Sequence, residues 1–215
     1  MEISWVCLDF GGVLNDDRSA REAMVAVLAE IVGVPVEEAW EVRRERKSIL
    51  ETLEFYAPDA ESFDDLRTRF EKRVLETPET FGSPPYTDVP PALKRLSGNH
   101  RLALASNTVG TARPWLTLHG LTEFFNLLFL SNEVGHRKPQ PEFFAKLIAA
   151  CGAEPGAMLM VGDRTDTDLA PALDAGMRAA LVRRFPRPLP GYEEIRGKLF
   201  AEVADLGKLA DRLGC

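Results

Sequence analysis

The chain has 215 residues, with 26 basic and 33 acidic side chains and a formal net charge of −7. This acidic balance leaves no broad cationic surface for nucleic acid or acidic lipid, so we set both classes of partner aside. No apolar run approaches the length of a membrane span, and the first residues lack the layout of a signal peptide. These features predict a cytoplasmic protein with no membrane contact. Cys7, Cys151 and Cys215 lie far apart, and we interpret them as reduced structural thiols.

The first predicted element is a buried strand over residues 3–8, a short apolar run that ends at Asp9. Taken alone, Asp9 is explained as well by turn formation as by a functional role. Gly11 and Gly12 follow it and permit a tight turn.

Residues 17–76 predict an all-helical insertion. Apolar residues recur at spacings of three and four over residues 21–34, 36–56 and 63–76, which is typical of amphipathic helices. A cluster of proline and glycine over residues 77–90 then indicates a hinge or linker. We expect Trp40 and Phe55 to belong to the core of this insertion.

From residue 89 onward, predicted helices and strands alternate. The helices cover residues 90–98, 111–120, 141–152 and 168–176, and the strands cover residues 101–106, 127–131, 157–162 and 178–182. Strict alternation predicts an α/β fold with a doubly wound parallel sheet. We therefore expect an α/β core formed by residues 1–16 and 82–215, and a small all-helical domain formed by residues 17–81 and inserted into that core.

Polar side chains follow four of the predicted strands. In an open parallel sheet, ligands bind beyond the carboxyl ends of the strands, which is where these side chains lie. They are Asp9 after the first strand, Ser106, Asn107 and Thr108 after the second, Ser131 to Lys138 after the third, and Asp163 and Asp168 after the fourth. We expect these strand ends to meet in one crevice. We interpret Asp166 as first-turn helix chemistry and Arg164 as a partner of nearby acids.

Together these residues resemble the haloacid dehalogenase-like hydrolase superfamily, in particular its members with a helical cap between the first and second motifs. Asp9 in "CLDFGGVLND" matches the nucleophile motif, and Ser106 in "LALASNT" matches the second motif. Lys138 in "EVGHRKPQPEFF" matches the third, while Asp163 and Asp168 in "MVGDRTDTDLAPALDAGM" match the fourth. The resemblance covers nearly the whole chain and implies a Rossmann-like core.

The resemblance and the residue types imply a magnesium-dependent phosphatase acting on a small phosphorylated metabolite. Asp9, Ser106 and Lys138 are the expected catalytic residues, and an aspartyl-phosphate would form on Asp9. Ser106, Asn107 and Lys138 are expected to bind the phosphate. The expected Mg²⁺ ligands are Asp9, Asp163, Asp168 and, as the resemblance implies, the main-chain carbonyl of Gly11.

One position departs from the pattern of the phosphatases that the chain resembles. They usually carry a second aspartate two residues after the nucleophile as general acid and base, whereas this chain has Gly11. We therefore expect weak activity or a restriction to good leaving groups. Two alternatives stay open, a dehalogenase that hydrolyses a carbon–halogen bond and a catalytically weak phosphate-binding or regulatory protein.

Overall fold

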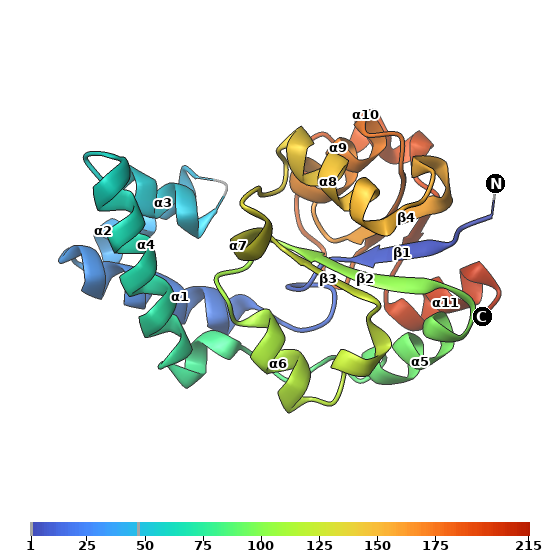
Figure 1. Cartoon of the computed structure of the whole chain (residues 1–215), viewed down its shortest axis with the longest axis horizontal. Helices are drawn as coiled ribbons and strands as arrows, with labels where there is room; N and C mark the ends of the chain where they lie inside the picture. The colour runs from blue at the N-terminus through green and yellow to red at the C-terminus, as the bar shows by residue number, and fades with distance from the viewer. Residues whose placement is uncertain (1, 47) are drawn as a thin grey trace. The chain divides into compact units, whose positions relative to one another are not determined.

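The computed structural model describes residues 2–46 and 48–215. The described residues form a six-stranded sheet in the order β3-β2-β1-β4-β5-β6, with parallel pairing throughout (Figure 1). The strands are β1 (Trp5–Leu8), β2 (Arg101–Ser106), β3 (Leu127–Leu130), β4 (Met158–Gly162), β5 (Arg178–Val182) and β6 (Ala201–Val203). The chain order reverses at β1, which lies between β2 and β4. This confirms the predicted doubly wound α/β fold.

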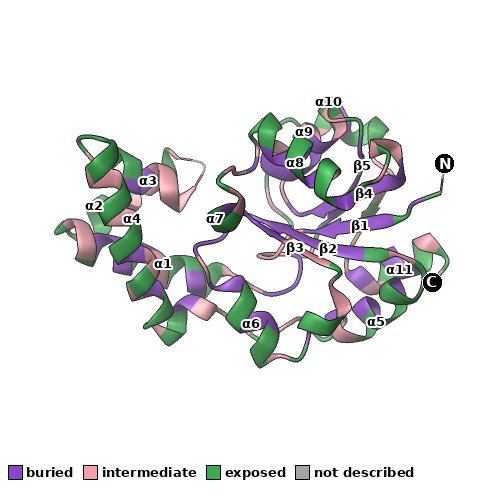
Figure 2. Ribbon diagram, viewed as in Figure 1, coloured by how far each residue is buried: buried purple, intermediate pink, exposed green. Residues whose placement is uncertain are grey.

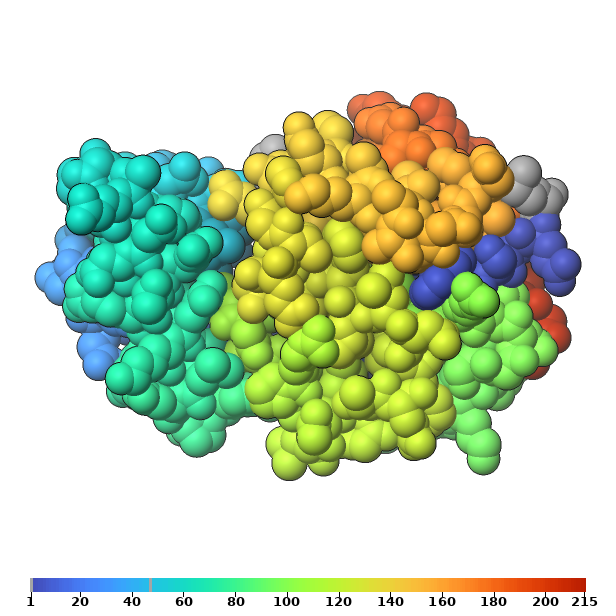
Figure 3. All heavy atoms as spheres, in the orientation of Figure 1, coloured from blue at the N-terminus to red at the C-terminus, as the bar shows by residue number. Residues whose placement is uncertain are grey.

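The central strands are buried on both faces, which explains their continuous apolar runs (Figure 2). On one face, Cys7 and Met160 pack in a cluster with Phe143, Phe144 and Leu147. Figure 3 shows that side chains fill the space that the ribbon of Figure 1 leaves open around the strands. All three cysteines are free thiols.

Helices cover both faces of this sheet (Figure 1). They are α5 (Val89–Asn99), α8 (Pro141–Cys151), α9 (Ala170–Asp174), α10 (Tyr192–Ile195) and α11 (Leu206–Leu213), with the short α7 (Ser131–Val134) directly after β3. Figure 1 shows α5 and α11 on one side of the sheet and α8, α9 and α10 on the other. The elements after β5 were absent from the prediction. β6 has three residues and α10 has four, too few for a clear period, whereas α11 has eight residues and apolar side chains at helical spacing that could have predicted it.

Contacts divide the chain into two compact units. One contains the chain up to Asp16 with Pro84–Thr108 and Leu116–Cys215, and the other contains Asp17–Ser83 with Val109–Trp115. The second unit therefore includes the first part of α6 (Ala112–Leu118), which the sequence analysis assigned to the core.

The helical unit contains α1 (Arg18–Val32), α2 (Val36–Arg44), α3 (Ile49–Tyr56) and α4 (Ala60–Leu75), so the stretch expected over residues 36–56 forms two helices. The reason is Ser48, whose hydroxyl accepts a hydrogen bond from the Glu51 N–H at 3.2 Å and begins α3. The expectation that Phe55 lies in the core is wrong. Its side chain is exposed, and the Arg46 guanidinium lies 4.2 Å from the ring centroid.

No helix among the described residues is both long and apolar enough to cross a membrane. The cytoplasmic location stays a prediction.

A mostly buried ion pair and its hydrogen bonds join four separate segments of the α/β unit. Arg184, after β5, donates to both carboxylate oxygens of Asp88 at 2.8 and 3.1 Å and to the Val13 carbonyl. Asp88 also accepts from the Leu206 N–H at 2.9 Å, at the start of α11. Burial would raise the pKa of Asp88, but the bonds from Arg184 outweigh it and lower the pKa.

Arg184→Met should lower the free energy of unfolding by about 3 kcal/mol, because it leaves the Asp88 carboxylate without its cation. Arg183→Met is the matched control. Arg183 pairs with Glu202, their side chains are 38% and 34% exposed, and such pairs contribute about 0–1 kcal/mol. Urea denaturation of both variants measures the difference, and equal losses would contradict the structural role of Arg184.

Candidate active site

Asp9 lies directly after β1, at the edge where the carboxyl ends of the strands meet. Its backbone N–H donates to the Val161 carbonyl of β4 at 2.9 Å, so the sheet pairing extends to this residue. A tight turn follows, in which the Leu14 N–H donates to the Phe10 carbonyl and the Gly12 N–H donates to the Asn15 carbonyl. The sheet and the turn together fix the main chain that carries the Asp9 carboxylate.

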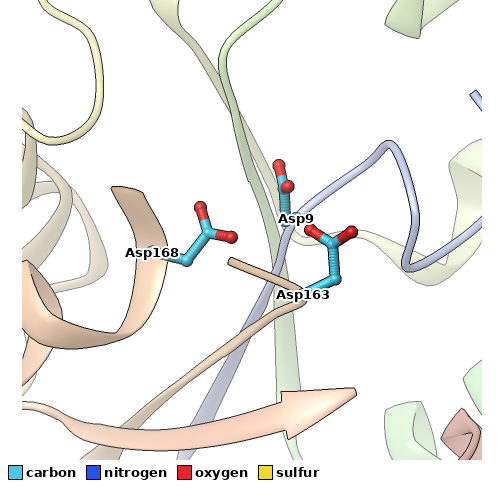
Figure 4. Close-up of side chains that lie close together, drawn as sticks. All are labelled: Asp9, Asp163 and Asp168. Carbon is cyan, nitrogen blue, oxygen red and sulfur yellow. The ribbon is translucent and has the colours of Figure 1, made fainter. Parts of the chain in front are cut away.

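Three carboxylates gather at this edge. Asp9, Asp163 and Asp168 each offer an oxygen within 4.8 Å of the others (Figure 4). Asp163 follows β4, and Asp168 belongs to a π-helical turn over Thr165–Leu169. The negative charges of these three carboxylates repel one another unless cations lie close by.

Lys138 supplies one of these cations. Its Nζ lies 2.8 Å from Asp9 Oδ1 and 2.6 Å from Asp168 Oδ1, and its side chain is 2% exposed. Burial would lower the pKa of Lys138, but the charges of Asp168 and Asp9 outweigh it and raise the pKa. Lys138 therefore stays cationic and joins two of the three carboxylates.

Asp168 is more deeply buried than the other two acids. Burial raises its pKa, while Lys138 and the Arg164 N–H, which donates to Asp168 Oδ2 at 3.1 Å, act in the opposite direction. A Cβ on Gly162 would lie 2.5 Å from the Asp168 side chain, so only glycine fits there. As the sequence analysis expected, Arg164 pairs with an acid, donating to both oxygens of Asp166 at 3.2 and 3.0 Å.

Asp163 has a cationic partner that the sequence analysis did not identify. Arg187 Nη2 lies 2.7 Å from Asp163 Oδ2 and also donates to the Asp163 carbonyl. Figure 4 shows one oxygen of Asp163 directed toward Asp9 and the other directed away. Arg187 follows β5 within a segment that also contains Arg183 and Arg184, and nothing in the sequence distinguishes the three.

Ser106 is the last residue of β2 and Asn107 follows it, so both lie at the strand end where the sequence predicted them. Ser106 is buried, and its hydroxyl lies 3.5 Å from the Asn107 carbonyl, which is longer than a normal hydrogen bond. The Asn107 carboxamide instead contacts the main chain of Lys138. The phosphate-binding roles of both residues, and the main-chain metal ligand at Gly11, stay predictions.

Comparisons with known proteins identify the family. The model of the haloacid dehalogenase-like hydrolase family matches residues 3–176, and the chain belongs to this family. A phosphoglycolate phosphatase of Cereibacter sphaeroides is 33% identical over 159 residues, covering 73% of this chain and 71% of the relative.

Solved structures share the fold over nearly the whole chain. A HAD phosphatase from Thermococcus onnurineus superposes with a TM-score of 0.68 and 22% identity, covering 100% of this chain and 98% of its own. A 2-haloacid dehalogenase from Pseudomonas syringae pv. Tomato DC3000 has a TM-score of 0.68 and 24% identity, covering 99% and 98%. The fold is therefore common to phosphatases and dehalogenases, and function has to be argued from the site.

Gly12→Ala should destabilise the protein more than Gly33→Ala. Both glycines have positive φ, +77° and +74°, so an alanine costs about 1–2 kcal/mol in either case. At Gly33 the new Cβ meets nothing within 4 Å, whereas at Gly12 it would lie 2.1 Å from Asp163 Oδ2 and displace that carboxylate. Urea denaturation compares the two variants, and equal losses would contradict the close approach of Asp163.

Proposed function

We propose that the protein is a magnesium-dependent phosphatase of a small phosphorylated metabolite that works through an aspartyl-phosphate on Asp9. The observation that carries this proposal is the carboxylate of Asp9 held by a buried lysine among two further carboxylates. The similarity to a curated phosphoglycolate phosphatase supports a phosphate ester as the substrate.

In the first step, a carboxylate oxygen of Asp9 attacks phosphorus, and the bond between phosphorus and the leaving-group oxygen breaks. In the second step, water attacks the same phosphorus, inorganic phosphate leaves, and the Asp9 carboxylate is regenerated. Lys138 orients Asp9 and presents positive charge to the transferring oxygens. The Ser106 hydroxyl, whose hydrogen bond to the Asn107 carbonyl is long at 3.5 Å, is available to donate to one of those oxygens.

The donor set fits Mg²⁺. The cluster offers oxygen ligands alone, which Mg²⁺ prefers, and Lys138 and Arg187 leave one negative charge across its three carboxylates. Asp9, Asp163, Asp168 and the Gly11 carbonyl are the residues proposed to hold the ion. When bound, Mg²⁺ neutralises charge on the phosphoryl oxygens.

Asp9→Asn should reduce hydrolysis of an aryl phosphate to less than about a hundredth of the wild-type rate, because it removes the nucleophile. A chelator should stop the wild-type enzyme, and Mg²⁺ should restore it. Asp211→Asn is the control, since it removes a carboxylate from a surface ion pair with Arg95 and should keep full activity.

Steady-state assays with an aryl phosphate and a chloro-acid, run side by side, separate the alternatives. Metal-independent turnover of the chloro-acid would favour a dehalogenase. Binding of inorganic phosphate without turnover of either compound would favour a regulatory role.

Gly11 limits the range of substrates in this proposal. Without a carboxyl group two residues after Asp9, the leaving group departs without protonation from that position. Aryl phosphates, acyl phosphates and sugar 1-phosphates have leaving groups that depart readily. We therefore propose substrates of this kind.

Gly11→Asp should raise the rate on an alkyl phosphate by about a hundredfold, because general acid catalysis contributes roughly two to four decades. The rate on an aryl phosphate should change little. Gly11→Asn is the matched control, with nearly the same shape and no acidic proton to transfer to the leaving group. An unchanged alkyl rate in a folded, magnesium-binding Gly11→Asp variant would show that another residue supplies the proton.

A further inference from the structure

The side chain of Asn107 forms two hydrogen bonds to the main chain of Lys138. The Lys138 N–H donates to Asn107 Oδ1 at 2.8 Å, and Asn107 Nδ2 donates to the Lys138 carbonyl at 2.9 Å. The Asn107 carboxamide thus binds both the main-chain N–H and the main-chain carbonyl of Lys138, the residue whose ammonium lies between Asp9 and Asp168.

The neighbouring contacts show the same reciprocal pattern. The hydroxyl of Ser131, after β3, accepts from the Thr108 N–H at 3.0 Å and contacts the Thr108 carbonyl at 3.2 Å. The Gln140 N–H donates to the Arg137 carbonyl, and the Gln140 side chain accepts from the Arg137 N–H, both at 2.8 Å. The segment that carries Lys138 is therefore held on both sides, and Asn107 contacts Lys138 itself.

A lysine head group has four rotatable bonds between it and the main chain, so its position depends on where the main chain is held. An error of about 1 Å in a catalytic group costs roughly a hundredfold in rate. Asn107 itself is exposed to solvent, whereas Lys138 is buried, so the carboxamide supplies hydrogen-bond partners to main-chain groups of a buried residue. The contact thus fixes the main chain from which the Lys138 side chain extends.

We propose that Asn107 is a positioning residue that acts through Lys138, in place of the phosphate-binding role assigned from the sequence. Its oxygen and one of its N–H groups are already engaged by Lys138. The catalytic part of this inference rests on the proposed phosphatase function. The placement of Lys138 by Asn107 does not.

The placement is tested without any assay of activity, by acylating the lysines with acetic anhydride and following each one by peptide mass spectrometry. Lys138 is buried and should react slowly in the wild type, and exposed Lys146 serves as the internal reference. Asn107→Ala should speed acylation of Lys138 at least tenfold relative to Lys146. An unchanged ratio would overturn the proposal.

The control is Asn126→Ala, which removes a similar contact at the opposite end of β2, where Asn126 Oδ1 accepts from the Leu102 N–H at 2.9 Å. It should leave the reactivity of Lys138 unchanged.

A double-mutant cycle with Lys138→Met then tests the catalytic part on an aryl phosphate. Asn107→Ala should lower kcat about 10- to 100-fold when Lys138 is present, and less than about twofold in the Lys138→Met background. Equal losses in both backgrounds would overturn the proposal and assign Asn107 its own contact with phosphate. A wild-type protein that hydrolyses no phosphate ester would refute the proposed function, and the acylation result would still decide whether Asn107 places Lys138.

Discussion

The ammonium of Lys138 between Asp9 and Asp168 is the interaction on which the site depends. Three carboxylates whose oxygens lie within 4.8 Å of one another are stable only with cations among them. Lys138 contacts two of them and Arg187 contacts the third. Because Lys138 is almost fully buried, the strand ends, the π-helical turn and the segment after β3 must all meet at its position.

The close packing of the carboxylates also constrains the backbone beside them. Gly12 and Gly162 lie so near Asp163 and Asp168 that a Cβ at either position would overlap a carboxylate. The turn after Asp9, the proposed nucleophile, therefore contains a glycine, Gly12, that the close approach of Asp163 requires. Gly11, in the same turn, removes the carboxyl that would protonate a leaving group, which links the local geometry to the proposed choice of substrate.

Much of the fold could be predicted from the sequence, because apolar runs alternating with amphipathic helices specify a parallel α/β sheet. The gathering of Asp9, Lys138, Asp163 and Asp168 also follows, since each comes after a strand of the same sheet. Arg187 was missed because its role depends on the path of an irregular segment. The contact of Asn107 with Lys138 was missed because a carboxamide that follows a strand can hydrogen-bond either to a ligand or to a neighbouring loop, and the sequence does not distinguish the two. The break between α2 and α3 had a signal in Ser48 and Glu51, a serine followed by an acid three residues later.

Asp9 is proposed to carry the phosphoryl group during turnover, and trapping that intermediate is the direct test of this role. The enzyme is quenched in acid while it hydrolyses an aryl phosphate in the presence of Mg²⁺, and its peptides are mapped by mass spectrometry. The account predicts one added phosphoryl group on Asp9 in the wild type and none in Asp9→Asn. A phosphoryl group on another residue, or full turnover by Asp9→Asn, would contradict it.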